Sequence, residues 1–199
     1  MKRGRVVLFD LGNVLVRIHP EAFADTLGVP ATESGNFRPL VIATTQRYER
    51  GELTSEEFFS NLGGIFGGRY DRPKLKEAMR NVIGKPIPGM PELLEKTASS
   101  GDVALVSNTN EEHFDYCRRN FAFLSLFPRY FLSWKMRVLK PDAEYYAHVL
   151  RQLNIPANHA LFIDDLPENI EGAVKAGMVG ILFDGAESLS ETLERLGVI

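Results

Sequence analysis

The sequence predicts an α/β fold in which a doubly wound, Rossmann-like parallel sheet contains an inserted helical unit. Two observations support this prediction. Short apolar runs that end in polar residues alternate with helical patterns over most of the 199-residue chain, and one long segment near the N-terminus contains helical patterns alone. Apolar strands that alternate with helices are typical of a parallel sheet covered on both faces.

Each strand of the predicted sheet is a short, continuous apolar run. Such a run is typical of a strand that is buried on both faces. The predicted strands are 6–9, 103–106, 160–163 and 179–183, with 130–133 as a weaker fifth strand.

Helical patterns separate these strands in the C-terminal part of the chain. Residues 91–98, 141–153 and 168–176 have helical spacing of their apolar residues. Pro141 is acceptable as a first helical residue, because that position needs no backbone N–H. Gly177 closes the last of these helices, since glycine readily adopts the left-handed conformation of a helix cap.

The segment 17–85 contains no run of the buried-strand type. We therefore expect a small helical unit inserted between the first strand and a discontinuous core made of residues 1–16 and 86–199, and the core is then close to the usual size of one domain. The helices expected in the insertion are 21–27, 39–50, 55–65 and 73–83.

Composition excludes several classes of protein. The chain is 44% hydrophobic and 25% charged with a net charge of −3, which is ordinary for a globular protein and offers no broad basic face for nucleic acid or an anionic membrane. Its single cysteine, Cys117, cannot form an internal disulfide, and no apolar run approaches the ~20 residues of a membrane helix. We expect a cytoplasmic protein with a small-molecule substrate; the oligomeric state stays open.

Polar residues follow three of the predicted strands directly. Asp10 ends the first, Ser107 and Asn108 end the second, and Asp164 and Asp165 end the third. In an open parallel sheet the ligand site lies outside the carboxyl ends of the strands, where these groups would meet. Three carboxylates in one place repel each other unless a cation shares them, and Mg²⁺ prefers such oxygen ligands. The pattern indicates a metal-assisted phosphoryl site.

Four short motifs occur in order along the chain. They read VLFDLGNVL at 7–15, LVSNTN at 105–110, KPD at 140–142 and FIDD at 162–165, with Glu168 and Asn169 beyond the last. The ordered set resembles the haloacid dehalogenase superfamily of phosphohydrolases, over essentially the whole chain. The DLGNV form of the first motif is similar to that of sugar-phosphate phosphatases.

The resemblance implies a role for each motif residue. Asp10 would be the nucleophile that forms an aspartyl-phosphate, which water then hydrolyses. Ser107 and the Asn108 backbone N–H would bind phosphoryl oxygens, and Lys140 would be a fixed positive charge beside the nucleophile and phosphate.

The resemblance also implies a Mg²⁺ site. Its ligands would be Asp10, the backbone carbonyl of Gly12 and the acidic pair, with Asp165 as the direct ligand and Asp164 close by or one layer further out.

Gly12 is a departure from the family pattern. Most phosphatases of the family have a second Asp there, which protonates the leaving oxygen and later activates water. Glycine keeps the backbone carbonyl for the metal but supplies no acid, and such help is worth about 10²–10⁴-fold. We therefore expect substrates whose leaving group needs little protonation, such as sugar 1-phosphates or acyl phosphates.

The inserted segment 17–85 is similar to the family's helical cap, which closes over the phosphate site. Arg47 or Arg50, at a turn between its helices, would reach substrate oxygens, although solvated charges beside a turn explain the same pattern. His19 follows the first motif and is a candidate to line the entrance and replace the missing acid, although a histidine in a linker is more often incidental.

The function predicted from these residues is Mg²⁺-dependent removal of phosphate from a small phosphorylated metabolite. A 2-haloacid dehalogenase is one alternative, since those relatives also lack the second Asp, but the pair Asp164 and Asp165 counts against it. A non-catalytic binder of a phosphorylated metabolite is the other, and the retained Asp10 and Lys140 count against that.

Overall fold

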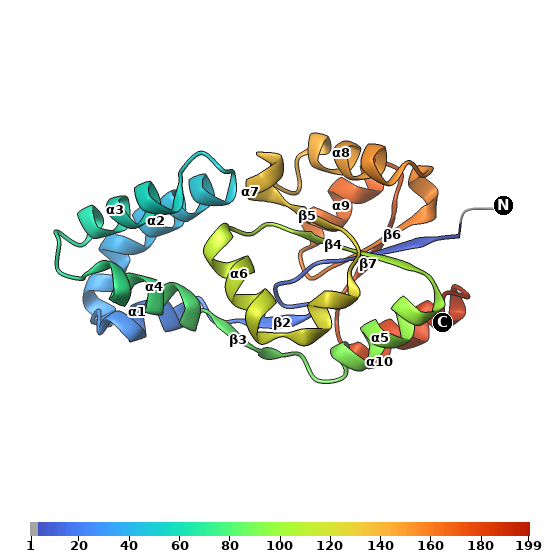
Figure 1. Ribbon diagram of the computed structural model, residues 1–199, viewed down its shortest axis with the longest axis horizontal. Helices are drawn as coiled ribbons and strands as arrows, with labels where there is room; N and C mark the ends of the chain where they lie inside the picture. Colours follow the sequence, from blue (N-terminus) through green and yellow to red (C-terminus); the bar gives the residue numbers. More distant parts are fainter. Residues whose placement is uncertain (1–3) are drawn as a thin grey trace.

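The computed structural model describes residues 4–199 and has a five-stranded parallel sheet at its centre (Figure 1). The strand order is β5-β4-β1-β6-β7, and every neighbouring pair is parallel. This confirms the predicted α/β fold; the part of the predicted core before Gly4 lies outside the described residues. The strands are β1 (Val6–Phe9), β4 (Asp102–Ser107), β5 (Tyr130–Leu132), β6 (Ala160–Asp164) and β7 (Val179–Leu182).

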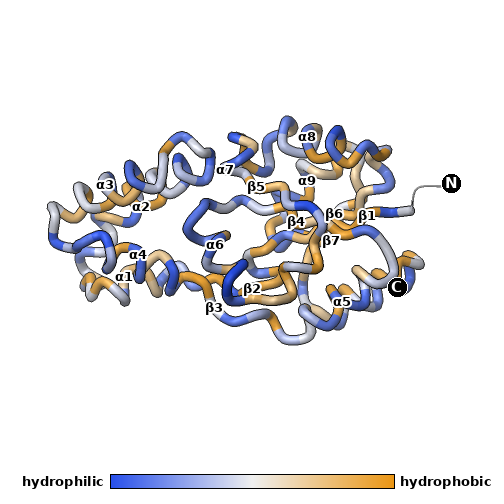
Figure 2. Tube along the Cα trace, in the orientation of Figure 1, coloured by the Kyte–Doolittle hydropathy of each residue, from blue (hydrophilic) through white to orange (hydrophobic). Residues whose placement is uncertain are grey.

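Helices cover both faces of the sheet, because successive side chains of a buried strand point to opposite faces. Val7 and Phe9 of β1 pack in one apolar cluster with α5, α6 and α10, whereas Val6 and Leu8 pack in a second cluster with α8 and α9. Figure 2 shows the apolar segments of the chain at these central strands. The helices are α5 (Met90–Ser100), α6 (Glu111–Asn120), α8 (Ala143–Leu153), α9 (Pro167–Lys175) and α10 (Ala186–Arg195).

Four further helices stand beside the sheet and share an apolar cluster of their own (Figure 1). Aromatic side chains dominate this cluster, and Tyr48 stacks on Phe58 with 4.4 Å between ring centroids. The start of α3 is fixed by a capping box in which Thr54 and Glu57 satisfy each other's backbone N–H groups. The helices are α1 (Glu21–Leu27), α2 (Ala31–Glu49), α3 (Ser55–Ile65) and α4 (Arg72–Asn81).

A short antiparallel pair of strands joins these helices to the sheet. β2 (Val16–Ile18) leads out and β3 (Ile83–Pro86) leads back. The sequence predicted neither strand and continued the last helix to residue 83. In the structure, Ile83 instead pairs with Ile18, a partner distant in the sequence that no helical pattern reveals.

Two helix starts differ from the prediction. α2 begins at Ala31 and contains Pro39, which the sequence had suggested as the start. Pro39 and Gly35 are both exposed, so water can satisfy the carbonyl that loses its helical partner. α8 begins at Ala143, and Asp142 precedes it as the capping position, so Pro141 lies outside the helix.

The edge of the sheet also differs from the prediction. β7 has β6 as its one neighbour, and its Val179 and Leu182 are 36% and 50% exposed, although the run had the pattern of a fully buried strand. Ser133 begins the short helix α7 (Ser133–Met136) instead of continuing β5, and α10 has no counterpart in the prediction. The remaining elements are the 3-10 helices η1 (Ala122–Leu126) and η2 (Ala157–His159). Within residues 4–199, none of the helices is both long and apolar enough to cross a membrane.

Candidate active site

Polar side chains from three adjacent strands lie together at the carboxyl end of the sheet. Phe9, the last residue of β1, is in register with Leu105 of β4 and Ile163 of β6, so the residues that follow these positions meet at one edge. Asp10 continues the pairing, since its backbone N–H donates to the Ile163 carbonyl at 3.0 Å. The order of the strands therefore explains why residues more than 150 positions apart share a site.

Lys140 lies at the centre of this strand-end cluster. Its ammonium group is 2.9 Å from Asp10 Oδ1 and 2.6 Å from Asp164 Oδ2, and it also donates to the Val106 carbonyl at 3.2 Å. The side chain is only 1% exposed. Burial by itself would lower the pKa of Lys140, but the charges of Asp10 and Asp164 more than offset burial and raise it. Lys140 is therefore a fixed cation at neutral pH.

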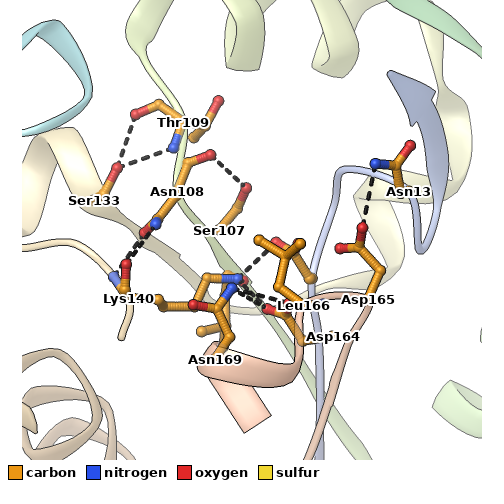
Figure 3. Close-up of polar contacts among 12 residues, drawn as sticks. Asn13, Ser107, Asn108, Thr109, Ser133, Lys140, Asp164, Asp165, Leu166 and Asn169 are labelled. Atoms are coloured by element: carbon orange, nitrogen blue, oxygen red, sulfur yellow. Dashed lines mark hydrogen bonds and ion pairs between the residues drawn. The ribbon is translucent and has the colours of Figure 1, made fainter. Parts of the chain in front are cut away.

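Asp164 is fully buried and held by donors on several sides (Figure 3). Besides Lys140, it accepts from the Leu166 backbone N–H at 2.9 Å and from Asn169 Nδ2 at 2.9 and 3.1 Å. Both carboxylate oxygens thus have protein partners. This arrangement favours a supporting role for Asp164 over direct binding of a metal.

Asp165 has more freedom. Its Oδ2 accepts one hydrogen bond, from Asn13 Nδ2 at 3.2 Å, while Asn13 Oδ1 accepts from the Ile18 backbone N–H at 3.1 Å. Asn13 adopts the left-handed conformation with φ of 52°, which asparagine tolerates well. Asn13 therefore connects the loop after β1 to the carboxylate after β6. The sequence pattern gave no indication of this hydrogen bond between Asn13 and Asp165.

The three carboxylates fit a divalent cation. One oxygen from each of Asp10, Asp164 and Asp165 lies within 4.8 Å of the others, and Lys140 is the cation that contacts two of them. Burial raises the pKa of Asp10 to about 7 against the lowering effect of Lys140, with a further contribution from Asp164. Burial also raises the pKa of Asp165. Burial therefore disfavours the ionised carboxylates more than the ammonium group of Lys140 favours them, and a further cation would stabilise the ionised forms.

Ser107 and Asn108 end β4 beside this cluster (Figure 3). The Asn108 side chain holds the Lys140 backbone from both directions: Nδ2 donates to the Lys140 carbonyl and Oδ1 accepts from the Lys140 N–H, each at 2.9 Å. The sequence suggested a role for the Asn108 backbone N–H, but it did not reveal these two side-chain hydrogen bonds to the Lys140 backbone. Ser107 Oγ makes only a long 3.4 Å contact with the Asn108 carbonyl, so its hydroxyl can bind another acceptor.

The charged residues that the sequence suggested in the inserted segment have ion-pair partners outside the strand-end cluster. Arg47 pairs with Glu52 at 3.2 Å, and Arg50 pairs with Asp142 at 3.4 Å. His19 pairs with Glu21 at 3.2 Å, and its ring packs against the backbone of Gly84. Within residues 4–199, no hydrogen bond or ion pair joins Arg47, Arg50 or His19 to the strand-end cluster.

Glu49, the last residue of α2, is a further acidic group that the charge of Asp10 affects. Burial, and to a smaller extent the charge of Asp10, together raise the pKa of Glu49 to about 7. An acidic residue in the same turn as Arg47 was the signal in the sequence, but nothing in its spacing separates it from the solvated charges nearby.

Comparison with known proteins agrees with this geometry. The sequence model of the family described as haloacid dehalogenase-like hydrolase matches residues 5–177. The sesquiterpene phosphatase astK of Aspergillus oryzae is 28% identical over 197 residues, which cover 97% of both chains. Flavin mononucleotide hydrolase 1 of Arabidopsis thaliana is 33% identical over 156 residues, which are 76% of this chain and 61% of that protein.

Solved structures have the same fold. A HAD-family enzyme of Bacteroides thetaiotaomicron in a magnesium complex superimposes with a TM-score of 0.86 at 23% identity, over 96% of this chain and 99% of that chain. At this level of identity the likeness concerns the fold. The magnesium ion belongs to the complex of the Bacteroides enzyme.

Proposed function

The chain belongs to the haloacid dehalogenase-like hydrolase family, and from this premise we propose that it removes phosphate from a small phosphorylated metabolite with Mg²⁺ as cofactor. The geometry of Lys140 supports the proposal, because its ammonium group contacts both Asp10 and Asp164 at the ends of neighbouring strands. A cation fixed beside a nucleophile stabilises the negative charge that develops during phosphoryl transfer.

In the proposed reaction the Asp10 carboxylate attacks phosphorus. The bond from phosphorus to the leaving oxygen breaks, an aspartyl-phosphate forms, and water hydrolyses it to inorganic phosphate. Ser107 Oγ and the Asn108 backbone N–H bind the phosphoryl oxygens. The Asn108 side chain keeps the Lys140 loop in place during both steps, since it holds the Lys140 backbone by two hydrogen bonds.

The metal ligands that we propose are Asp10, the Gly12 carbonyl and Asp165. When bound, Mg²⁺ neutralises the charge shared by the nucleophile and the phosphate. Asp164 stays beside the metal as the partner of Lys140, because its oxygens already accept from Asn169 and Leu166.

We propose that residues 17–85 form a cap over this site and that residues 1–16 and 86–199 form the core. The separate apolar cluster of α1 to α4 and the two-strand connection formed by β2 and β3 support this division. Arg47 is the proposed substrate contact of the cap. Its pairing with Glu52 leaves the side chain 55% exposed, so an anionic substrate can compete for it.

The substrate class follows from Gly12. Gly12 itself cannot protonate a leaving oxygen, so sugar 1-phosphates and acyl phosphates, whose leaving groups need less protonation, are favoured over alkyl phosphates unless a residue of the inserted segment supplies the proton.

Phosphate release from a panel of sugar, acyl and alkyl phosphates, with and without Mg²⁺, tests this function. We expect release that requires Mg²⁺ and disappears in Asp10→Asn. Release of halide from 2-haloacids without Mg²⁺ would identify a dehalogenase instead. Binding of phosphorylated ligands without Asp10-dependent release from any of them would identify a binding protein.

A further inference from the structure

One carboxyl group near the strand-end cluster has no partner, and it belongs to the inserted helices. Glu49 is the last residue of α2. In the described part of the chain, no hydrogen bond or ion pair engages its carboxyl group, and the charge of Asp10 contributes, after burial, to the raised pKa of Glu49. Its side chain is partly exposed, so it lies among protein groups but stays accessible.

The residues on either side of Glu49 have partners of their own. Tyr48 is buried in the helical unit, where it stacks on Phe58. Arg47 and Arg50 are held by their ion pairs with Glu52 and Asp142. Among these neighbours, Glu49 is the one that the electrostatics link to Asp10.

The turn after α2 is fastened to the sheet domain, so the position of Glu49 is not arbitrary. Gly51 has φ of 66° and packs so closely on α7 that a Cβ there would overlap the Trp134 carbonyl oxygen. Arg50 pairs with Asp142, two residues after Lys140. Two anchors therefore hold this turn beside the loop that positions Lys140.

We propose that Glu49 is the proton donor and acceptor of the reaction, the role that Gly12 cannot fill. This inference rests on the proposed phosphatase function and identifies a further catalytic residue for it. His19, which the sequence suggested for this role, is instead paired with Glu21 and packed against Gly84.

The proton balance is as follows. When Asp10 attacks phosphorus, the electron pair of the breaking P–O bond moves to the leaving oxygen, and the Glu49 carboxyl proton transfers to that oxygen. The Glu49 carboxylate then takes a proton from water as the water oxygen attacks the aspartyl-phosphate. The phosphorus–Asp10 bond breaks, the Asp10 carboxylate is restored, and Glu49 is protonated for the next cycle.

The surroundings of Glu49 suit a proton donor at neutral pH. General acids are most effective when their pKa lies near the working pH, and burial and Asp10 bring the pKa of Glu49 to about 7. The charged groups on the elements around the turn are few and mostly paired. They are Asp10 and Lys140 of the cluster, Lys135, Arg137 and Asp142 on or beside α7 and α8, and Arg47, Arg50 and Glu52 of the turn.

The test compares leaving groups in Glu49→Gln, which keeps the size of the side chain and removes its ionisable proton. With ethyl phosphate, whose alkoxide is a poor leaving group, we expect kcat/KM to fall about 10²–10⁴-fold. With p-nitrophenyl phosphate, whose phenolate leaves without protonation, we expect kcat/KM to change less than about threefold, since this parameter reports the first phosphoryl transfer. Because water activation is also lost, the variant should release p-nitrophenol in a burst followed by a slow phase.

The pH profile provides a second readout. In the wild type, kcat/KM for ethyl phosphate should fall as the pH rises through the pKa of Glu49, because the donor loses its proton. This alkaline decline should be absent in Glu49→Gln and retained in Glu49→Asp. Glu56→Gln, which removes an exposed carboxylate from the start of α3, is the matched control and should change neither readout.

A relocated acid should rescue the variant. Gly12→Asp in the Glu49→Gln background should raise kcat/KM for ethyl phosphate at least tenfold above that of Glu49→Gln alone. This requires a slight movement of Ile18, whose Cγ1 would lie 3.1 Å from the new Cβ.

Several results would overturn the proposal. Equal losses for both substrates, no loss for ethyl phosphate, or a wild type that hydrolyses p-nitrophenyl phosphate but no alkyl phosphate would each exclude Glu49 as the acid. If Glu49→Gln does not fold, Glu49→Asp decides the question through its pH profile: loss of the alkaline decline there excludes the role. Absence of any Asp10-dependent turnover in the wild type would instead refute the phosphatase function itself.

Discussion

The strand-end cluster and the turn after α2 differ in how their charged side chains are held. Lys140 and Asp164 are almost fully buried, and each has partners from several elements. Arg47 and Arg50 of the turn are 55% and 41% exposed, and each has one ion pair. Exposed pairs contribute about 0–1 kcal/mol, whereas breaking a buried pair costs several times more. The difference indicates a rigid cluster at the sheet and arginine side chains on the turn that can exchange partners at little cost.

The largest effect should come from Lys140→Met, which keeps the apolar stem and removes the charge. We expect loss of turnover and a decrease of about 3–5 kcal/mol in the free energy of unfolding at pH 8, because Asp10 and Asp164 then face each other without a cation. Without Lys140, the native state holds a proton on this carboxyl pair up to a higher pH than the unfolded chain does. Since the native state then binds more protons, the defect is smallest at low pH and grows as the pH rises.

Urea unfolding at pH 5 and pH 8 measures this effect. Lys135→Met, at an exposed position of α7, is the control and should be close to neutral at both values. An equal defect at the two pH values would mean that packing, and not charge, is the contribution of Lys140.

A smaller effect is expected for Asn13→Gly. Glycine accepts the positive φ of this position, so the backbone is unstrained and the two side-chain hydrogen bonds, to Asp165 and from the Ile18 backbone N–H, are lost. Loss of such an orienting bond typically weakens metal binding about 10–100-fold. Calorimetric titration with Mg²⁺ should show this, and Asn13→Asp should be weaker than wild type as well if Asp165 loses its donor. Unchanged affinity in both variants would remove Asn13 from the metal site.

The smallest effect on stability is expected for Arg47→Ala. Its exposed pair with Glu52 should contribute less than about 1 kcal/mol to unfolding. If Arg47 contacts the substrate, KM should nevertheless rise several-fold with kcat little changed. Steady-state kinetics next to thermal unfolding separates the two readouts, and an unchanged KM would leave Arg47 as a solvated charge.

The strands of the sheet were predictable because each is a buried apolar run ending at a polar residue. Residues 6–9, 103–106 and 160–163 all lie in strands of the structure. The pairing of β2 with β3 was not predictable, since Ile18 and Ile83 are far apart in the sequence and are neighbours only in the folded chain. For the same reason the run at 179–183 was read as buried: its exposure depends on its place at the sheet edge.

The chemistry of the site divides in the same way. The sequence places Asp10, Ser107 and Asp164 after apolar runs, which is a local property that needs no knowledge of the fold. The family resemblance adds that Gly12 stands where an acid is usual. Which side chains hold these groups depends on distant contacts. Three interactions each join segments far apart in the chain: the hydrogen bond from Asn13 to Asp165, the two hydrogen bonds between the Asn108 side chain and the Lys140 backbone, and the effect of the Asp10 charge on Glu49. Their energies depend on burial, which arises only when the sheet and the inserted helices pack together.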